Sequence, residues 1–191
     1  MTARVPLAVL GARLFALRRT VLYSCVAAFV AGLASPPGYA APLFLCSLLG
    51  IAIALAQSPG LHPHLDHCEQ GAPLFGRQLA RAKALVPCVA ATAAALAYAV
   101  AQAVRGAPDL PVMLIVTLAG AIPATLTALS ATIRHGAARV LYVALAALSS
   151  AAAYALAAEA HSVSLELAFS AAVSFLALRQ YGEALARYDP I

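Results

Sequence analysis

The sequence contains little charge: of its 191 residues only 10% are charged, while 63% are apolar. Soluble domains carry roughly 25% charged residues, so most of this chain does not belong in water. A soluble chain of this size would still expose about a third of its unfolded surface, and this sequence has too few polar residues to cover it. The composition therefore predicts an integral membrane protein. The net charge of +5 gives no support for a nucleic-acid partner.

Motifs of several enzyme classes are also missing. The chain has no GxSxG nucleophile turn, no HExxH metal motif and no pair of carboxylates deep in its apolar runs. Its four cysteines include no CxxC pair, and Cys25 and Cys46 lie in apolar runs, which favours free thiols. We therefore expect a protein that is not an enzyme and that holds no cofactor of its own.

The sequence does contain long uncharged runs. A transmembrane helix needs about 20 apolar residues, and six runs come near that length, at about 20–34, 39–57, 84–104, 110–133, 140–158 and 162–178. The prediction is an all-α, polytopic fold with about six transmembrane helices in one domain, 1–191. Its parts are an N-terminal interfacial helix (1–19), helices one and two (20–57), a cytoplasmic loop with an amphipathic helix (58–83), helices three to six (84–178) and a cytoplasmic tail (179–191).

The basic residues predict the orientation. Of the 12 Lys and Arg residues, all except Arg105 fall on one side of the membrane in a six-helix topology. The positive-inside rule assigns that side to the cytoplasm, together with both termini. We expect a multi-pass protein of the inner, cytoplasmic membrane.

The segment 74–86 predicts an amphipathic helix that ends at Pro87. Leu74, Phe75, Leu79, Ala82, Leu85 and Val86 gather on one side of a helical wheel, and Arg77, Arg81 and Lys83 gather on the other. Such a helix could dock a cytosolic partner or could rest on anionic lipid headgroups. The stretch 6–19 is a second, less regular interfacial helix.

Three further features are candidates for sites. His62, His64, His67 and Cys68 carry side chains that bind transition metals, but their spacing matches no standard zinc pattern, so a solvated loop is the default expectation. Glu166 is a carboxylate inside the sixth run, which makes it a candidate for a transport pathway unless it reaches water at the helix end. Pro123 is expected to kink helix four along the same pathway, with Thr125 or Ser130 satisfying freed backbone groups.

One stretch resembles a known family. The sequence Glu69-Gln-Gly-Ala-Pro-Leu-Phe-Gly-Arg-Gln-Leu-Ala-Arg-Ala-Lys83, between the second and third runs, is similar to the coupling helix of permease subunits of ATP-binding-cassette transporters of the type-two exporter class. The closing segment 179–189 is similar to their cytosolic tail. Here 159–161 leaves no room for the extracellular elements of larger members, so the resemblance indicates a short, diverged permease.

The resemblance implies a function and partners. A separate cytoplasmic P-loop ATPase, carrying ATP and Mg²⁺, would dock on Glu69, Leu74, Phe75, Arg77, Arg81 and Lys83. A second permease copy or homologous subunit would complete the pathway within the lipid. Two other interpretations stay open: a structural subunit of a membrane complex that transports nothing, and the substrate-capture component of a vitamin-type uptake system.

Overall fold

The computed structural model describes residues 11–36, 38–58, 61, 76–107, 109–159 and 163–187; within these, the side chains of 76–78, 159 and 186 are not described. Over these residues the fold is all-α, as predicted. The principal helices are α2 (Arg18–Ala34), α3 (Ala40–Leu55), α5 (Gly76–Val104), α6 (Leu110–Ala131), α7 (Gly136–Glu159) and α8 (Val163–Arg187).

Four of the described helices are long and apolar enough to cross a bilayer. Their spanning segments are Leu79–Val104, Leu110–Ala131, Gly136–Ala158 and Val163–Leu185. Helix α3 is apolar but has only 16 residues, and α2 has 17 with two arginines at its start. At 1.5 Å per residue, each of these two helices is about 25 Å long, which is shorter than the hydrocarbon layer of about 30 Å. The structure therefore shows four spans of full length where the sequence predicted about six.

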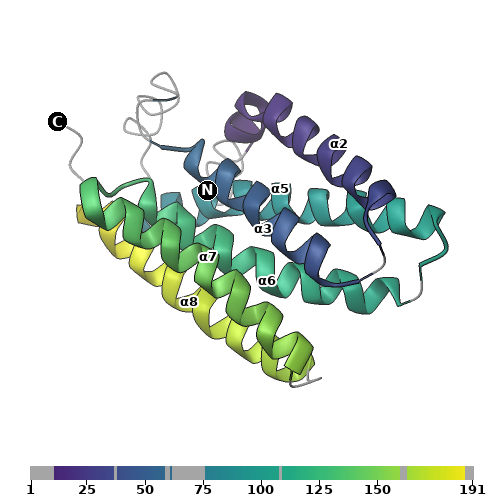
Figure 1. Ribbon diagram of the computed structural model, residues 1–191. Helices are drawn as coiled ribbons and strands as arrows, with labels where there is room; N and C mark the ends of the chain where they lie inside the picture. The colour runs from purple at the N-terminus through teal and green to yellow at the C-terminus, as the bar shows by residue number, and fades with distance from the viewer. Residues whose placement is uncertain are drawn as a thin grey trace.

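Successive helices run in alternating directions, and α6 lies at the centre (Figure 1). It packs against α3, α5, α7 and α8, while α2 packs mainly on α5. The starts of α2, α5 and α7 and the ends of α3, α6 and α8 therefore lie at one end of the bundle, which we call the basic end. Its described basic side chains are Arg13, Arg18, Arg19, Arg81, Lys83, Arg134, Arg139, Arg179 and Arg187, with Arg105 at the opposite end.

Glycines let the inner helices approach closely. A Cβ added at Gly32 of α2 would lie 2.8 Å from the Cβ of Ala101 and 2.9 Å from the carbonyl oxygen of Tyr98, both on α5. At Gly120 of α6 it would lie 2.7 Å from Leu43 Cγ of α3. Lipid is as apolar as a leucine side chain, so helices in a bilayer associate through close packing of small residues. These glycines give α2–α5 and α3–α6 their contacts.

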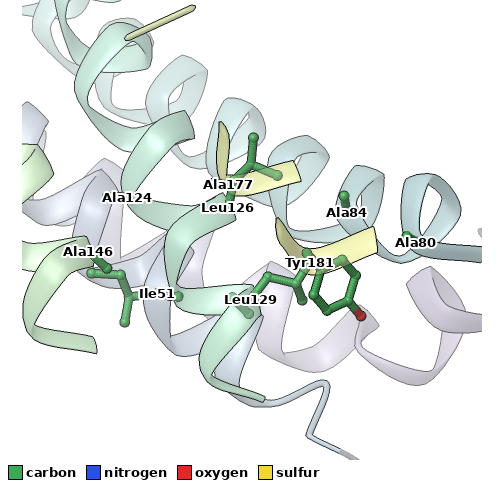
Figure 2. Close-up of a cluster of buried hydrophobic side chains, with 11 residues drawn as sticks. Ile51, Ala80, Ala84, Ala124, Leu126, Leu129, Ala146, Ala177 and Tyr181 are labelled. Carbon is green, nitrogen blue, oxygen red and sulfur yellow. The ribbon is translucent and has the colours of Figure 1, made fainter. Parts of the chain in front are cut away.

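A cluster of apolar side chains joins five helices, α3, α5, α6, α7 and α8, towards the basic end (Figure 2). Tyr181 of α8 is 2% exposed and packs with Leu129 of α6 and with Ala80 and Ala84 of α5. Most other members of the cluster are alanines, so the single aromatic ring fills the space between three backbones. The end of α8 is thereby fixed to the start of α5.

Two helices extend beyond their predicted limits. We predicted an amphipathic helix that ends at Pro87, but α5 continues through Pro87 without interruption. Proline costs one helical hydrogen bond, and packing against neighbouring helices compensates for that loss. Helix α8 likewise continues to Arg187, through most of the predicted tail. Both extensions carry helical backbone from the bundle core into its basic end.

The predicted interfacial helix at the N-terminus is described only from residue 11. Residues 11–16 are helical and Leu17 forms a turn before α2. The N–H of Leu17 donates to Arg13 at 3.0 Å and the N–H of Val21 donates to Leu17 at 2.9 Å. Since the helical hydrogen bonds continue across the turn, this segment leads directly into α2 rather than forming a separate element.

Candidate functional site

The residues predicted to contact an ATPase are only partly described. Glu69, Leu74 and Phe75 lie outside the described residues, and Arg77 lies in the first turn of α5 with an undescribed side chain. Arg81 is exposed at the basic end. Lys83, by contrast, is only 8% exposed and has interactions within the chain.

The helical wheel placed two side chains on the wrong sides of α5. Lys83 was assigned to the polar face but is buried, whereas Leu85 was assigned to the apolar face and is 50% exposed. Ala82, Ala84 and Val86 are buried around Lys83. A wheel ranks faces by polarity, but in a membrane protein the outward face meets lipid and accepts leucine. Lys83 is therefore buried in the bundle, whereas its contact with a docking partner stays a prediction.

Buried polar groups accompany Lys83 at the basic end. Arg13 is 1% exposed, and Gln57, just after the end of α3, is 3% exposed. Neither nitrogen nor oxygen of the Gln57 amide has a hydrogen-bonding partner. One turn deeper, Leu17, just before α2, packs with Ile53 of α3 and Val86 of α5. The interior of this end thus combines two cations with an unsatisfied amide above an apolar layer.

Helices α7 and α8 are linked at the basic end by polar side chains. The guanidinium carbon of Arg134, in the α6–α7 connection, lies 4.0 Å from the ring centre of Tyr142. The Tyr142 hydroxyl donates to Gln180 Oε1 of α8 at 3.1 Å. Arg134 thus stacks the connection against α7, and the Tyr142–Gln180 hydrogen bond joins α7 to α8.

The end of the bundle opposite the basic end contains a polar contact that the sequence analysis missed. Gln102 of α5 is 1% exposed, and its Nε2 donates to the carbonyl oxygens of Gly32 at 2.8 Å and Ser35 at 3.3 Å. Arg105 also donates to Ser35. The last carbonyls of a helix lack partners within it, and a cation there complements the helix dipole. Gln102 of α5 and Arg105, directly after α5, therefore cap α2. The sequence signal for this contact was a Gln near the end of an apolar run.

The two candidate pathway residues, Glu166 and Pro123, lie on α8 and α6, away from the α2–α5 contact. Glu166, in the first turn of α8, is 0% exposed, and neither carboxylate oxygen has a hydrogen-bonding partner. The expectation that it reaches water at the helix end is therefore not met. Pro123 is buried inside α6.

Hydroxyl groups surround the break that Pro123 makes in the α6 hydrogen bonds. Thr125 donates to the carbonyl of Ala121 at 2.6 Å and Thr127 donates to that of Pro123 at 2.8 Å. The carbonyl that Pro123 leaves without a helical donor is that of Ala119, and neither of these bonds reaches it. The hydroxyl of Ser130 has no hydrogen-bonding partner.

The predicted metal ligands His62, His64, His67 and Cys68 lie outside the described residues. Among the residues that are described, no group of three or more His, Cys, Asp or Glu side chains is placed to hold an ion. The described cysteines, Cys25, Cys46 and Cys88, are free thiols.

Comparisons with known proteins add no relative. No protein-family model, no curated protein and no solved structure matches the chain.

Proposed function

We propose that this chain is the permease subunit of an ATP-driven transporter of the ATP-binding-cassette type. In this proposal six helices cross the inner membrane, both termini and the basic end face the cytoplasm, and a separate ATPase binds at the segment that leads into α5. Two copies, or this chain and a homologous subunit, enclose the pathway. The resemblance of residues 69–83 to a coupling helix suggests the partner.

The continuity of α5 is the observation that carries the proposal. The helix runs unbroken for 29 residues from Gly76 to Val104, a length of about 43 Å. Its first turn contains Arg77, and its far end caps α2 through Gln102. A displacement imposed on the first turns of α5 would therefore reach the outer end through one rigid rod. A transporter driven from the cytoplasm requires such a connection.

The six-span topology is supported by the alternation of the helices. Helices α2 and α3 are shorter than the hydrocarbon layer, but a short span is accommodated by local thinning of the bilayer and by basic side chains that reach the headgroups. Arg18 and Arg19 at the start of α2 are exposed and suited to that role. Counting both helices as spans places every described basic residue except Arg105 on one side.

The test is co-purification from the native host in mild detergent, followed by mass spectrometry. We expect a P-loop ATPase in stoichiometric amount with the wild-type chain and its loss with the double variant Arg77→Gln, Arg81→Gln. The matched control is Arg139→Gln, Arg187→Gln, which removes the same charge from the same end outside the coupling segment. This control should retain the ATPase.

Two outcomes would contradict the proposal. If other membrane subunits co-purify and no ATPase does, the chain is a structural subunit; if a small ligand co-purifies, it is a capture component. Orientation is tested separately with a membrane-impermeant thiol reagent on intact cells that carry a cysteine at Ala72 or Ala107 in a background without native cysteines. Labelling at position 72 rather than 107 would reverse the topology and remove the docking surface from the cytoplasm.

A further inference from the structure

A groove lies on the outside of the bundle at its basic end, between the start of α5 and the end of α8. Its volume is about 390 Å³, and its walls are formed by Ala80 and Arg81 of α5 and by Phe175, Leu178, Arg179, Gly182 and Glu183 of α8. At its floor the two helices meet at Ala80 and Gly182, where an added Cβ would lie 3.9 Å from the Ala80 Cβ. Because Gly182 has no side chain, the space above this contact remains open.

The charged residues of the groove leave one positive charge in excess, since two guanidinium groups face one carboxylate. Arg81 is exposed and makes no hydrogen bond or ion pair within the described chain. Arg179 donates from Nε to Glu183 Oε1 at 2.9 Å, while its terminal amino groups have no such partner. The Glu183 bond thus holds Arg179 in place and leaves its outer nitrogens available to an anion, which two guanidinium groups bind well.

The rest of the groove is apolar and lies deeper in the membrane. Phe175 is 67% exposed and stands one turn before Arg179 on α8, about 6 Å further from the basic end. The spanning segment of α5 begins at Leu79 and that of α8 ends at Leu185. Both arginines thus lie just inside the ends of these segments, two residues from Leu79 and six residues from Leu185, a position from which the long arginine side chain can extend to the headgroups. Phe175 lies deeper in the apolar segment than either arginine.

We propose that this groove binds one anionic phospholipid, with its phosphate at Arg81 and Arg179 and an acyl chain along Phe175 and Leu178. A soluble phosphate would use the two arginines but would leave the apolar wall uncovered, whereas a phospholipid matches both halves of the groove. The lipid would join α5 to α8 at the end where force enters α5. The binding site depends only on the membrane location of the chain and stands whether or not an ATPase is its partner.

The test uses the full-length protein, delipidated in detergent and titrated with dioleoylphosphatidylglycerol or dioleoylphosphatidylcholine while native mass spectrometry counts retained lipids. We expect one tightly retained phosphatidylglycerol and no comparable retention of phosphatidylcholine. Arg81→Gln and Arg179→Gln should each weaken retention about fivefold, the effect of one cation near an anionic headgroup. The control Arg139→Gln removes an exposed charge from the first turn of α7 at the same end and should change retention by less than about twofold.

Three results would overturn the proposal: equal retention of the neutral lipid, an equal loss with Arg139→Gln, or displacement of the lipid by millimolar inorganic phosphate. The last would identify a soluble phosphate as the ligand. Thermal unfolding of each variant checks that the bundle is intact. Since Arg179 lies outside the predicted coupling segment, Arg179→Gln should reduce lipid retention without releasing the ATPase, and this variant separates failure of one proposal from failure of the other.

Discussion

Helices α6 and α7 are similarly long and apolar, yet they have opposite surroundings. In the apolar window of α6, 72% of the residues are buried inside the bundle, against 22% in α7 and 11% in α8. Large apolar side chains such as Leu148 and Phe175 point outward from the α7–α8 hairpin. Apolarity therefore does not decide which helix is central, because lipid accepts the same side chains. Close approach at small residues decides it, and α3 and α6 meet through Gly50 and Gly120.

The comparison is between the core, where α3 packs on α6, and the α7–α8 hairpin. The largest expected effect comes from replacing a core glycine, Gly50, with alanine. A Cβ at Gly50 would overlap Thr125 Oγ1 and lie 3.3 Å from Thr125 Cβ, in a site where Thr125 is fully buried and hydrogen-bonded to its own helix. We expect Gly50→Ala to destabilise the protein by about 1–3 kcal/mol, the usual cost of overpacking.

Gly182→Ala is the matched change in the α7–α8 hairpin. Its Cβ would make ordinary contact with Ala80 at 3.9 Å, so we expect no loss and a gain of up to about 1 kcal/mol from helix propensity. Thermal unfolding in detergent measures both variants. Equal destabilisation by the two would show that the glycines do not distinguish the core from the hairpin.

A medium effect is expected at the polar contact between α2 and α5, and a smaller effect at the polar contact within the α7–α8 hairpin. Gln102→Leu removes the buried donor that caps α2 and leaves the Gly32 carbonyl without its partner, which should cost about 1–2 kcal/mol. In the hairpin, Gln180→Leu removes an exposed bond to Tyr142 and should cost less than about 0.5 kcal/mol. Unfolding midpoints of the two variants give the comparison, and a larger effect at Gln180 would reverse it.

Where the core and the hairpin meet, we expect an effect smaller than that of Gln102→Leu. Ser150 of α7 hydrogen-bonds Ser47 of α3 through their hydroxyls at 2.9 Å, and such bonds between membrane helices contribute about 0.6 kcal/mol. Ser150→Ala should therefore lower stability by about that amount. Ser149→Ala is the control, since the Ser149 hydroxyl bonds only within α7, to Ala146. A double-mutant cycle with Ser47→Ala should recover the coupling, and an additive result would rule it out.

The positions of most helices followed from the sequence, because proline, glycine and charge bound each apolar run. The run predicted at 110–133 became α6 at Leu110–Ala131, and that at 39–57 became α3 at Ala40–Leu55. The prediction failed at Pro87, where it read a local helix breaker as a helix end. Neighbouring helices hold α5 together there, and a linear sequence does not show those neighbours.

The candidate site was less predictable than the helices. Arg81 was singled out and is exposed, whereas Lys83 was placed on the polar face and is buried, and the capping pair Gln102 and Arg105 was overlooked. These three outcomes depend on which helix lies opposite α5 at each level. Lys83 meets the interior of the basic end and Gln102 meets the end of α2. Polarity along one helix contains no information about either neighbour.

The sequence by itself determined that the chain is a helical protein for the bilayer, roughly where its helices lie, and that its cations gather at one end. Composition, run length and charge spacing are local properties. They determine which segments can enter lipid, because charged and unpaired polar groups cost free energy there. Only the tertiary structure decided that α6 is central, that α5 is one rod and that a charged groove opens beside α8. Those features depend on steric fit between residues far apart in sequence, such as Gly50 and Thr125. Apolarity alone does not select the contacts, because lipid solvates every apolar helix surface equally well.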